Sequence, residues 1–300
     1  MWTADLEKTK KRYNELLKLY NEEGLNADNF FCNKYNDCHN SLCDKNVVKQ
    51  FSGGTAALMP FYDIYLNKKP IRVLIVGKEN GYMKNKPFKT SSNFDENILN
   101  VLNCIEWKNK NNHIKGTLMT LQRIYGVESE YIYASYTLTN LLRCAFQNTE
   151  KHENLSDVND TSKMRDNCFE YLIKEIKILE PTLIILQGEW SIKGKQNIVS
   201  KLYEHFKESE NRLMSNSNDK YGLYQFNNFM LITSHHPAIL GNWIKNLAPD
   251  SLWPAIDYLK EIGYIPMVNS ETSTEEYLKL VKEPVDNILK KTISNDSLRK

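Results

Sequence analysis

The sequence predicts an α/β fold, a three-layer α/β/α sandwich around a central parallel sheet of four strands. Short apolar segments rich in β-branched or aromatic residues recur at residues 72–76, 131–138, 182–186 and 229–233. Segments of this kind are typical of strands whose two faces are both buried. Helical patterns separate them, and such alternation implies right-handed crossovers that place helices on both faces of the sheet.

The first helix is expected at residues 3–23, where apolar side chains repeat at helical spacing. Thr3 can cap its start and Gly24 can end it. The charged C-terminal segment is expected to be peripheral. The later helices are expected at residues 96–105, 116–125, 162–179, a stretch ending near 207, 253–262 and 275–289. The polar stretch that follows residue 207 predicts a loop.

Composition narrows the class of protein. The chain has 300 residues, of which 41% are hydrophobic and 25% charged, values that are ordinary for a soluble protein with a core. The net charge of +2 shows no global basicity, so nucleic-acid binding would need a local patch. No apolar run approaches membrane-spanning length, and the N-terminus lacks an apolar signal segment, so we expect a cytoplasmic protein. We divide it into an N-terminal helix extension (1–31), an α/β domain with a cysteine cluster (32–265) and a C-terminal helical extension (266–300).

Polar residues follow each expected strand, and parallel strands bring their carboxyl ends to one edge of the sheet. These polar segments are residues 77–82, 139–140, 188–190 and 234–237. One site would then hold Glu79, Asn140 and His236, with Lys78 and His235 nearby. His235 is expected to be structural or solvent-facing.

A carboxylate, an amide and an imidazole together suit the cleavage of a glycosidic bond. The amide can read the donor and acceptor edge of a base, and the imidazole can stabilise an anionic leaving group. The carboxylate can orient water or stabilise a cationic sugar. Glycosidic cleavage passes through an oxocarbenium-like state, which needs this placement of charge.

Five short motifs also follow one another along the chain. They are a strand followed by GKENG at 77–81, KPF at 86–88, LTNLLRC at 138–144, a helix with CFEYL and LEP within 168–181, and TSHHPA at 233–238. In this order they resemble the uracil-DNA glycosylase superfamily, and most closely its family-four type, which carries an iron–sulfur cluster. The resemblance covers about residues 32–260 and implies a uracil-DNA-glycosylase-like fold.

The resemblance implies roles for individual residues. Phe88 would stack on the extruded base, with core packing as the alternative, and Asn140 would hydrogen-bond the pyrimidine edge. His236 would face the base oxygen that gains charge. The loop that follows would approach the DNA minor groove with Leu240 as a wedge, or as a packing residue, and with Trp243 as a further contact. A base inside a duplex is out of reach, so base flipping requires such a space-filling side chain.

The first motif departs from the family pattern. Lys78 and Asn80 stand where the family has Glu and Pro, and both could meet a base or its substituents. Glu79 occupies the position at which other branches carry their catalytic Asp or Asn, so we assign it, as a hypothesis, to orienting water or stabilising the sugar. Gly81 permits a bulky 5-substituent on the pyrimidine. Because distant members of the superfamily excise glucosylated hydroxymethylcytosine in defence against phage, this substrate is a candidate beside uracil.

The six cysteines of the chain include candidates for a metal centre. In a reducing compartment they are more typical of metal ligands or core residues than of disulfides. The resemblance implies that Cys38, Cys43, Cys144 and Cys168 bind a [4Fe–4S] cluster, with Cys32 as an alternate ligand. Four thiolates are the usual set for this cluster. A zinc site formed by the same thiolates, and unligated core cysteines, are the alternatives.

These observations together predict a monofunctional DNA glycosylase. It would flip a pyrimidine, hydrolyse its N-glycosidic bond and leave an abasic site, and it would act as a monomer. The alternative is a module of the same fold that binds modified or single-stranded DNA without cutting it. Phosphate contacts are expected from local lysine clusters. They are Lys84, Lys86 and Lys89, then Lys108, Lys110 and Lys115, then Lys193 and Lys195.

Overall fold

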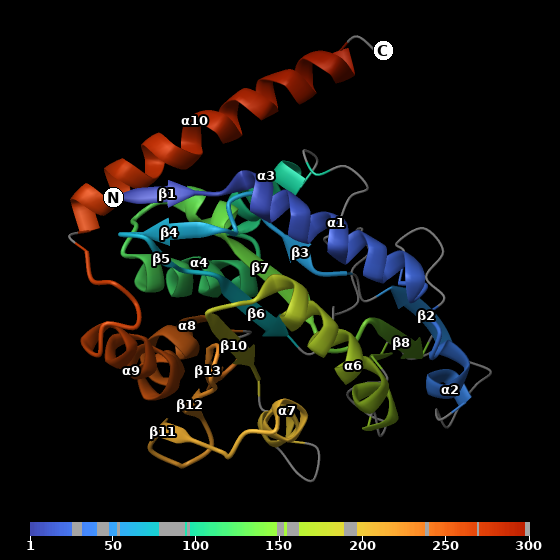
Figure 1. The fold of residues 1–300 in the computed structure, drawn as a ribbon. Coiled ribbons are helices and arrows are strands. Elements are labelled where there is room, and N and C mark those ends of the chain that lie inside the picture. The colour runs from blue at the N-terminus through green and yellow to red at the C-terminus, as the bar shows by residue number, and fades with distance from the viewer. Residues whose placement is uncertain are drawn as a thin grey trace.

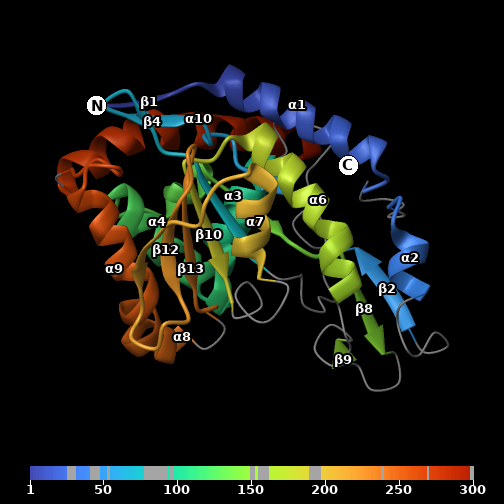
Figure 2. The ribbon, with the colours of Figure 1, turned by 60° about the horizontal axis from the view of Figure 1, so that its bottom comes forward.

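The computed structural model shows a mixed central sheet with helices on both of its faces (Figure 1, Figure 2). It describes residues 1–25, 32–40, 48–52, 55–77, 94, 97–148, 153–154, 162–188, 197–237, 240–268 and 270–297. Among the helices within these ranges, none combines the length and the apolar composition that crossing a bilayer requires.

The central sheet has seven strands in the order β11-β12-β13-β10-β6-β7-β3. The four strands in its middle, β13, β10, β6 and β7, run parallel to one another. The outer three pair antiparallel to their neighbours. The bounds are β3 Ala57–Leu58, β6 Val73–Gly77, β7 Tyr136–Asn140, β10 Leu183–Gln187, β11 Arg212–Ser215, β12 Gly222–Gln225 and β13 Met230–Ser234.

The prediction of four parallel strands is confirmed for the middle of the sheet, but the prediction that these strands form the whole sheet is wrong. β3 has only two residues, too few to show the period of a strand. β11 and β12 form a hairpin at one edge, and the side chains of β11 are half-buried or exposed. Its sequence therefore lacks the apolar pattern of the buried strands and looks like a polar loop.

The parallel strands are buried on both faces, as their apolar sequences predict. All five residues of β6 are buried. Leu74 and Val76 belong to one buried cluster, which includes side chains of α1, α6 and α7. Val73 and Ile75 belong to a second, which includes side chains of α3, α4, α9 and α10. Because successive strand residues point to opposite faces, the two clusters are the two cores of a three-layer sandwich.

The helices lie close to their expected positions. Their bounds are α1 Leu6–Glu22, α2 Tyr35–Asn40, α3 Asn97–Trp107, α4 Asn112–Tyr125, α6 Ser162–Leu179, α7 Ile198–Phe206, α8 Leu240–Asn242, α9 Ala248–Glu261 and α10 Ser270–Ser297. A π-helical turn, Trp243–Leu247, joins α8 to α9. The first helix begins later than expected because Asp5, and not Thr3, caps it by accepting a hydrogen bond from the Lys8 amide.

The second strand also begins later than expected. Glu130–Ser135 forms a 3₁₀ helix, and β7 starts only at Tyr136. The Ser129 hydroxyl accepts a hydrogen bond from the Tyr131 amide, and the Tyr133 hydroxyl donates to the carbonyl of Ile114 on α4. The tyrosines that suggest a strand thus pack as a helical turn, because tertiary contacts override β-propensity.

Two small sheets lie outside the central one. The first has the order β1-β4-β5, with β1 Trp2–Ala4, β4 Ile64–Leu66 and β5 Lys69–Pro70. The second has the order β2-β8-β9, with β2 Val48–Ser52, β8 Cys144–Asn148 and β9 Glu153–Asn154. In the chain, β8 of the second sheet follows β7 after a short segment.

The C-terminal helix α10 is not peripheral in its first half, contrary to the expectation from its charge. Tyr277, Val281 and Val285 are fully buried, and Trp2 donates from Nε1 to Ser273 Oγ at 3.0 Å. The charged residues occupy the other faces of an amphipathic helix, so composition alone hides its buried stripe. The far end of α10 projects beyond the rest of the ribbon (Figure 1).

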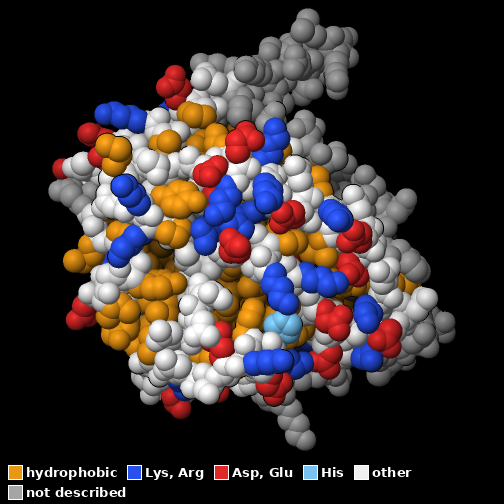
Figure 3. Space-filling model, in the orientation of Figure 1, with side chains coloured by type: hydrophobic (Ala, Val, Ile, Leu, Met, Phe, Trp, Pro, Cys, Tyr) orange, Lys and Arg blue, Asp and Glu red, His pale blue; other side chains and the backbone are white. Residues whose placement is uncertain are grey.

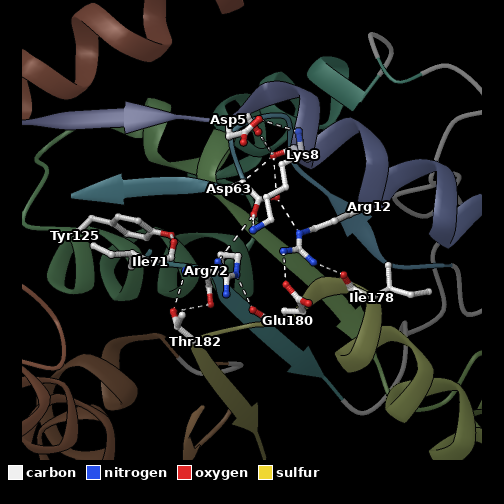
Figure 4. Close-up of polar contacts among 11 residues, drawn as sticks. Asp5, Lys8, Arg12, Asp63, Ile71, Arg72, Tyr125, Ile178, Glu180 and Thr182 are labelled. Carbon is white, nitrogen blue, oxygen red and sulfur yellow. Dashed lines mark hydrogen bonds and ion pairs between the residues drawn. The ribbon is translucent and has the colours of Figure 1, made fainter. Parts of the chain in front are cut away.

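A buried carboxylate, Asp63, ties α1 to the amino ends of the central strands (Figure 4). Arg12 of α1 donates from Nε to Asp63 at 2.9 Å and from Nη2 to Glu180 at 2.7 Å. Arg72, just before β6, donates from Nε to the Glu180 carbonyl at 2.6 Å. This network closes the amino edge of the sheet and leaves the carboxyl edge for chemistry.

Candidate active site

The carboxyl ends of the parallel strands meet at one edge of the sheet, as the sequence predicts. Gly77 of β6 pairs in register with Asn140 of β7. Gln187 of β10 pairs with Ser234 of β13. The segments that leave these strands therefore start along one edge of the sheet, which is the usual place for a site in an open α/β sheet.

The amide of Asn140 lies directly over Gly77. A Cβ atom built on Gly77 would be 2.5 Å from Asn140 Oδ1, closer than any real contact allows. The following amide, of Leu141, donates to the Gly77 carbonyl at 2.9 Å. Asn140 is half-buried. A residue without a side chain at position 77 thus gives Asn140 its place beside the start of the first loop.

A buried ionic network supports the segment that carries Asn140. Glu175 of α6 accepts hydrogen bonds from Thr139 Oγ1 at 2.9 Å and from Arg143 Nη2 at 2.7 Å. Its other oxygen accepts from the Tyr20 hydroxyl of α1 at 2.7 Å. All of these side chains are buried. One carboxylate therefore holds residues on both sides of Asn140 and joins them to two helices.

His236 follows β13 and is stacked on His113 of α4, with ring centroids 4.8 Å apart and an interplanar angle of 10°. His236 is exposed to solvent, yet its pKa is lowered to about 4, first by desolvation and then by His113. Nε2 of His113 is 2.8 Å from Oε1 of Gln187, and burial lowers the pKa of His113 against the effect of that hydrogen bond. Both imidazoles are thus neutral near pH 7.

The loop that carries His236 packs against α4 and its own downstream helix. A Cβ on Gly116 would lie 2.5 Å from Pro237 Cβ, so α4 and the loop are in close contact. Trp243 is fully buried and donates from Nε1 to the His235 carbonyl at 3.2 Å. Trp243 thus packs against the histidine loop, and its contact with DNA stays a prediction.

The other residues of this loop keep their sequence-based interpretations. Leu240 is half-buried beside the core, so wedge and packing residue both stay predictions. His235 is half-buried with its ring centroid 4.1 Å from that of Tyr221, as expected of a structural residue. Lys108 is paired with Glu130, and Lys110 lies 3.2 Å from Glu106, so these two cations of the second lysine cluster are partly neutralised.

Several predicted site residues lie outside the residues that the structure describes. They are Lys78, Glu79, Asn80, Phe88 and Cys43, together with the lysines of the first and third clusters. Their roles stay predictions. Of the predicted group, the structure brings Asn140 and His236 to one edge of the sheet.

Three of the cysteine thiols gather near α6. Cys32, Cys38 and Cys168 are buried in one core cluster, and Cys168 interacts electrostatically with both of the others. Burial raises the pKa of Cys168 to about 12, and Cys38 Sγ accepts a hydrogen bond from Asn167 at 3.2 Å. The backbone of Cys144 starts β8. The donor chemistry suits a thiolate-bound metal, although no set of three or more described Cys, His, Asp or Glu residues is arranged to hold one.

Two cavities among the described residues lie away from this edge. One of about 400 Å³ is lined by Arg72, Lys177 and Phe229 among others, and one of about 550 Å³ by Lys8, Arg12 and their neighbours. Both are at the amino ends of the strands. Basic and acidic side chains alternate on the face that Figure 3 shows, so it lacks the uniform positive charge that favours DNA.

Sequence analysis missed three residues of the site. His113 stacks on His236, and Gln187 is hydrogen-bonded to His113. Glu175 accepts a hydrogen bond from Thr139, next to Asn140. A signal for His113 was present, because Asn111 is a good N-cap and places His113 in the first turn of a helix. Glu175 lies on the apolar face of α6, where no sequence pattern distinguishes a buried carboxylate from an exposed one.

Comparison with known families agrees with this geometry. A family model described as the uracil DNA glycosylase superfamily matches residues 65–260. This range contains the four parallel strands, Asn140 and His236. No curated protein matches the chain. The chain belongs to the uracil-DNA glycosylase superfamily.

Proposed function

We propose that the protein is a monofunctional DNA glycosylase, which flips a pyrimidine nucleotide and hydrolyses its N-glycosidic bond. The observation that carries the proposal is the pair of Asn140 and His236 at the carboxyl edge of the sheet, in a chain of this superfamily. An amide held over Gly77 and a neutral imidazole after β13, at the same edge of the sheet, would recognise a base and its leaving oxygen.

In the proposed reaction the bond between the sugar C1′ and the base nitrogen breaks, and its electron pair leaves with the base. Asn140 reads the donor and acceptor edge of the flipped base. The neutral imidazole of His236 donates a hydrogen bond to the base oxygen that gains charge, which lowers the barrier most when the donor is already in place. Glu79 orients the water that attacks C1′ or stabilises the cationic sugar. We expect no lyase step, because none of the motifs assigns a lysine as a Schiff-base nucleophile. Lys78 is the residue to substitute if a lyase product is detected.

For the substrate, we propose uracil or a 5-modified cytosine, such as glucosylated hydroxymethylcytosine in phage DNA. Lys78 and Asn80 support the second substrate because they add hydrogen-bond donors to the first loop, and Gly81 leaves space at the pyrimidine 5-position. The test is mass spectrometry of bases released from uracil-containing DNA, unmodified DNA, and DNA with hydroxymethylated or glucosylated cytosine. Release from uracil-containing DNA alone identifies a repair enzyme. Release from glucosylated DNA alone identifies an enzyme of phage defence.

A second candidate function is favoured by the altered first motif. A protein that has lost the family's Glu and Pro at positions 78 and 80 could bind modified or single-stranded DNA without cutting it. DNA binding by the wild type that weakens with rising salt, with no base released from any substrate, would identify this function.

For the cysteines, we propose that Cys38, Cys43, Cys144 and Cys168 hold a [4Fe–4S] cluster, with Cys32 as an alternate ligand and zinc as the alternative metal. The burial of Cys32, Cys38 and Cys168 in one cluster supports this proposal. Such a cluster would act as a structural tie between the N-terminal segment and the sheet. Iron and acid-labile sulfide should copurify with the wild type and be lost from Cys168→Ser. Cys104→Ser is the control, because Cys104 is equally buried but lies in the other core.

A further inference from the structure

His113 is fixed more firmly than an ordinary surface histidine. It lies in the first turn of α4, where the Asn111 side chain caps the helix and accepts a hydrogen bond from the His113 amide. Its imidazole is bonded to Gln187, which is fully buried at the end of β10. The ring is therefore held from its backbone and from one nitrogen, and it is stacked on His236.

The stack with His113 does not use the hydrogen-bonding atoms of His236. The two nitrogens of an imidazole lie in the plane of the ring, whereas His113 covers a face. With the Gln187 amide as assigned, Oε1 can only accept, so Nε2 of His113 carries its proton. His113 thus limits the plane of the His236 ring without occupying the atom that would donate to a base.

The surroundings of the pair oppose a positive charge. The N-terminus of α4 presents partial positive charge beside His113, which disfavours an imidazolium there. Lys115 is the next charged residue on α4, His235 adjoins His236, and Tyr221 of the neighbouring strand segment contacts His235. His235 in turn helps to lower the pKa of Asp250 on α9, after the hydrogen bonds that Asp250 accepts from Ser217 and Asn216. Among the described residues, no carboxylate is found to act on the pKa of His113 or of His236.

We infer that His113 is a positioning residue for His236: held by Gln187, it fixes the plane of the His236 imidazole and keeps that imidazole neutral. The kinetic consequence of this inference rests on the proposed glycosylase function, whereas its effect on His236 does not. Removal of the His113 ring should free the plane of His236 and admit water around it, so that its protonation becomes easier.

The direct test is an NMR titration of ¹³C- or ¹⁵N-labelled histidines in the full chain. In the wild type His236 should titrate near 4, well below its ordinary value of 6.5. In His113→Ala its pKa should rise toward 6.5. In His113→Phe, where an uncharged ring can still cover His236, the pKa should stay below that of the alanine variant. His205→Ala is the matched control, because His205 is exposed on α7 and should leave the His236 titration unchanged.

The kinetics of base release give a second measurement. A purely structural role of His113 would not change kcat separately from KM, or change the pH dependence of the rate. Because a misplaced reacting group is costly, kcat for base release should fall about 10- to 100-fold in His113→Ala with little change in KM. The rate of His113→Ala should also fall further, relative to the wild type, below pH 6.5. His113→Phe should retain more activity than His113→Ala. Should His236 titrate near 6.5 in the wild type, or stay unchanged in His113→Ala, the inference is wrong. If no substrate releases a base while the titration shifts as expected, the inference stands and the proposed glycosylase function fails.

Discussion

At the residue scale, the candidate site depends on Gly77 having no side chain. The sequence shows Asn140 in a short motif and Gly77 at the end of a strand, but it does not show that the two touch. The structure places Asn140 Oδ1 where a Cβ at position 77 would lie. The glycine is therefore a requirement of the amide position, in addition to any role in the turn that follows.

Gly77→Ala should displace the Asn140 amide and lower base release about 100-fold or more, the usual effect of losing one preorganised group. The measurement is a double-mutant cycle with Asn140→Ala. In the Asn140→Ala background the new methyl group meets no amide, so Gly77→Ala should have little further effect. Equal and additive losses in the two backgrounds would show that Gly77 acts independently of Asn140.

Glu175 and Arg143 form a second residue-scale feature, a buried ion pair behind the site. Arg143→Met leaves the carboxylate in the core without its cationic partner, and should lower the free energy of unfolding by about 3–5 kcal/mol. The double variant Arg143→Met/Glu175→Met should recover most of this loss, because it removes the uncompensated charge. Denaturant unfolding measures both.

The control for the buried pair is Lys18→Met, which breaks the exposed pair between Lys18 and Glu22 at 3.8 Å. Exposed pairs contribute little, so its stability should match the wild type. Equal stabilities of Arg143→Met and the wild type would mean that Glu175 is satisfied by Tyr20 and Thr139 alone.

At the scale of elements, the contact between α4 and the loop after β13 brings the two histidines together. Gly116 sits one turn after His113 and faces Pro237, which follows His236. The approach is close because Gly116 has no side chain where α4 meets the Pro237 ring. The expected helix start at residue 116 was four residues too late, and that error placed His113 outside the helix.

Gly116→Ala should push α4 away from the loop. The added Cβ would meet Pro237 at 2.5 Å, and overpacking of this kind costs about 1–3 kcal/mol. Thermal or denaturant unfolding should show the loss, and the His236 resonance should shift. Gly241→Ala is the control for stability, because a Cβ there meets nothing within 4 Å. An unchanged His236 resonance in Gly116→Ala would show that the contact between Gly116 and Pro237 does not position the histidine pair.

At the scale of the whole molecule, the sequence was sufficient for the parallel centre of the sheet and for the edge that carries the site. Buried strands and the motifs after them are local signals, which explains why the sequence predicts β6, β7, β10 and β13 and the placement of Asn140 and His236 after two of them. The edge strands, the His113 stack and the Glu175 network depend on contacts between distant segments, so no local pattern marks them. The integration of α10 was missed because its buried face is narrow and its overall composition is charged.

Truncation of a side chain on α10 tests whether this helix belongs to the core. Tyr277 is fully buried, and its hydroxyl contacts Ser135 Oγ at 2.6 Å and donates to the Tyr131 carbonyl at 3.1 Å. Tyr277→Ala should lower the free energy of unfolding by about 3–5 kcal/mol, as for other large aromatic side chains. Lys279→Ala, an exposed change on the same helix, should have no effect. Identical unfolding of the two variants would place α10 outside the cooperative core.

The most direct test of the central claim is the release of free base from DNA by the wild type, Asn140→Ala and His236→Ala, with DNA binding measured in parallel. The account predicts that the wild type frees a pyrimidine from at least one of the uracil-containing or modified DNAs and leaves abasic sites. Each variant should still bind DNA, but its rate of base release should be lower than that of the wild type by a factor of about 100 or more. Release at the wild-type rate by both variants, or no release by the wild type from any of these DNAs, would contradict the claim.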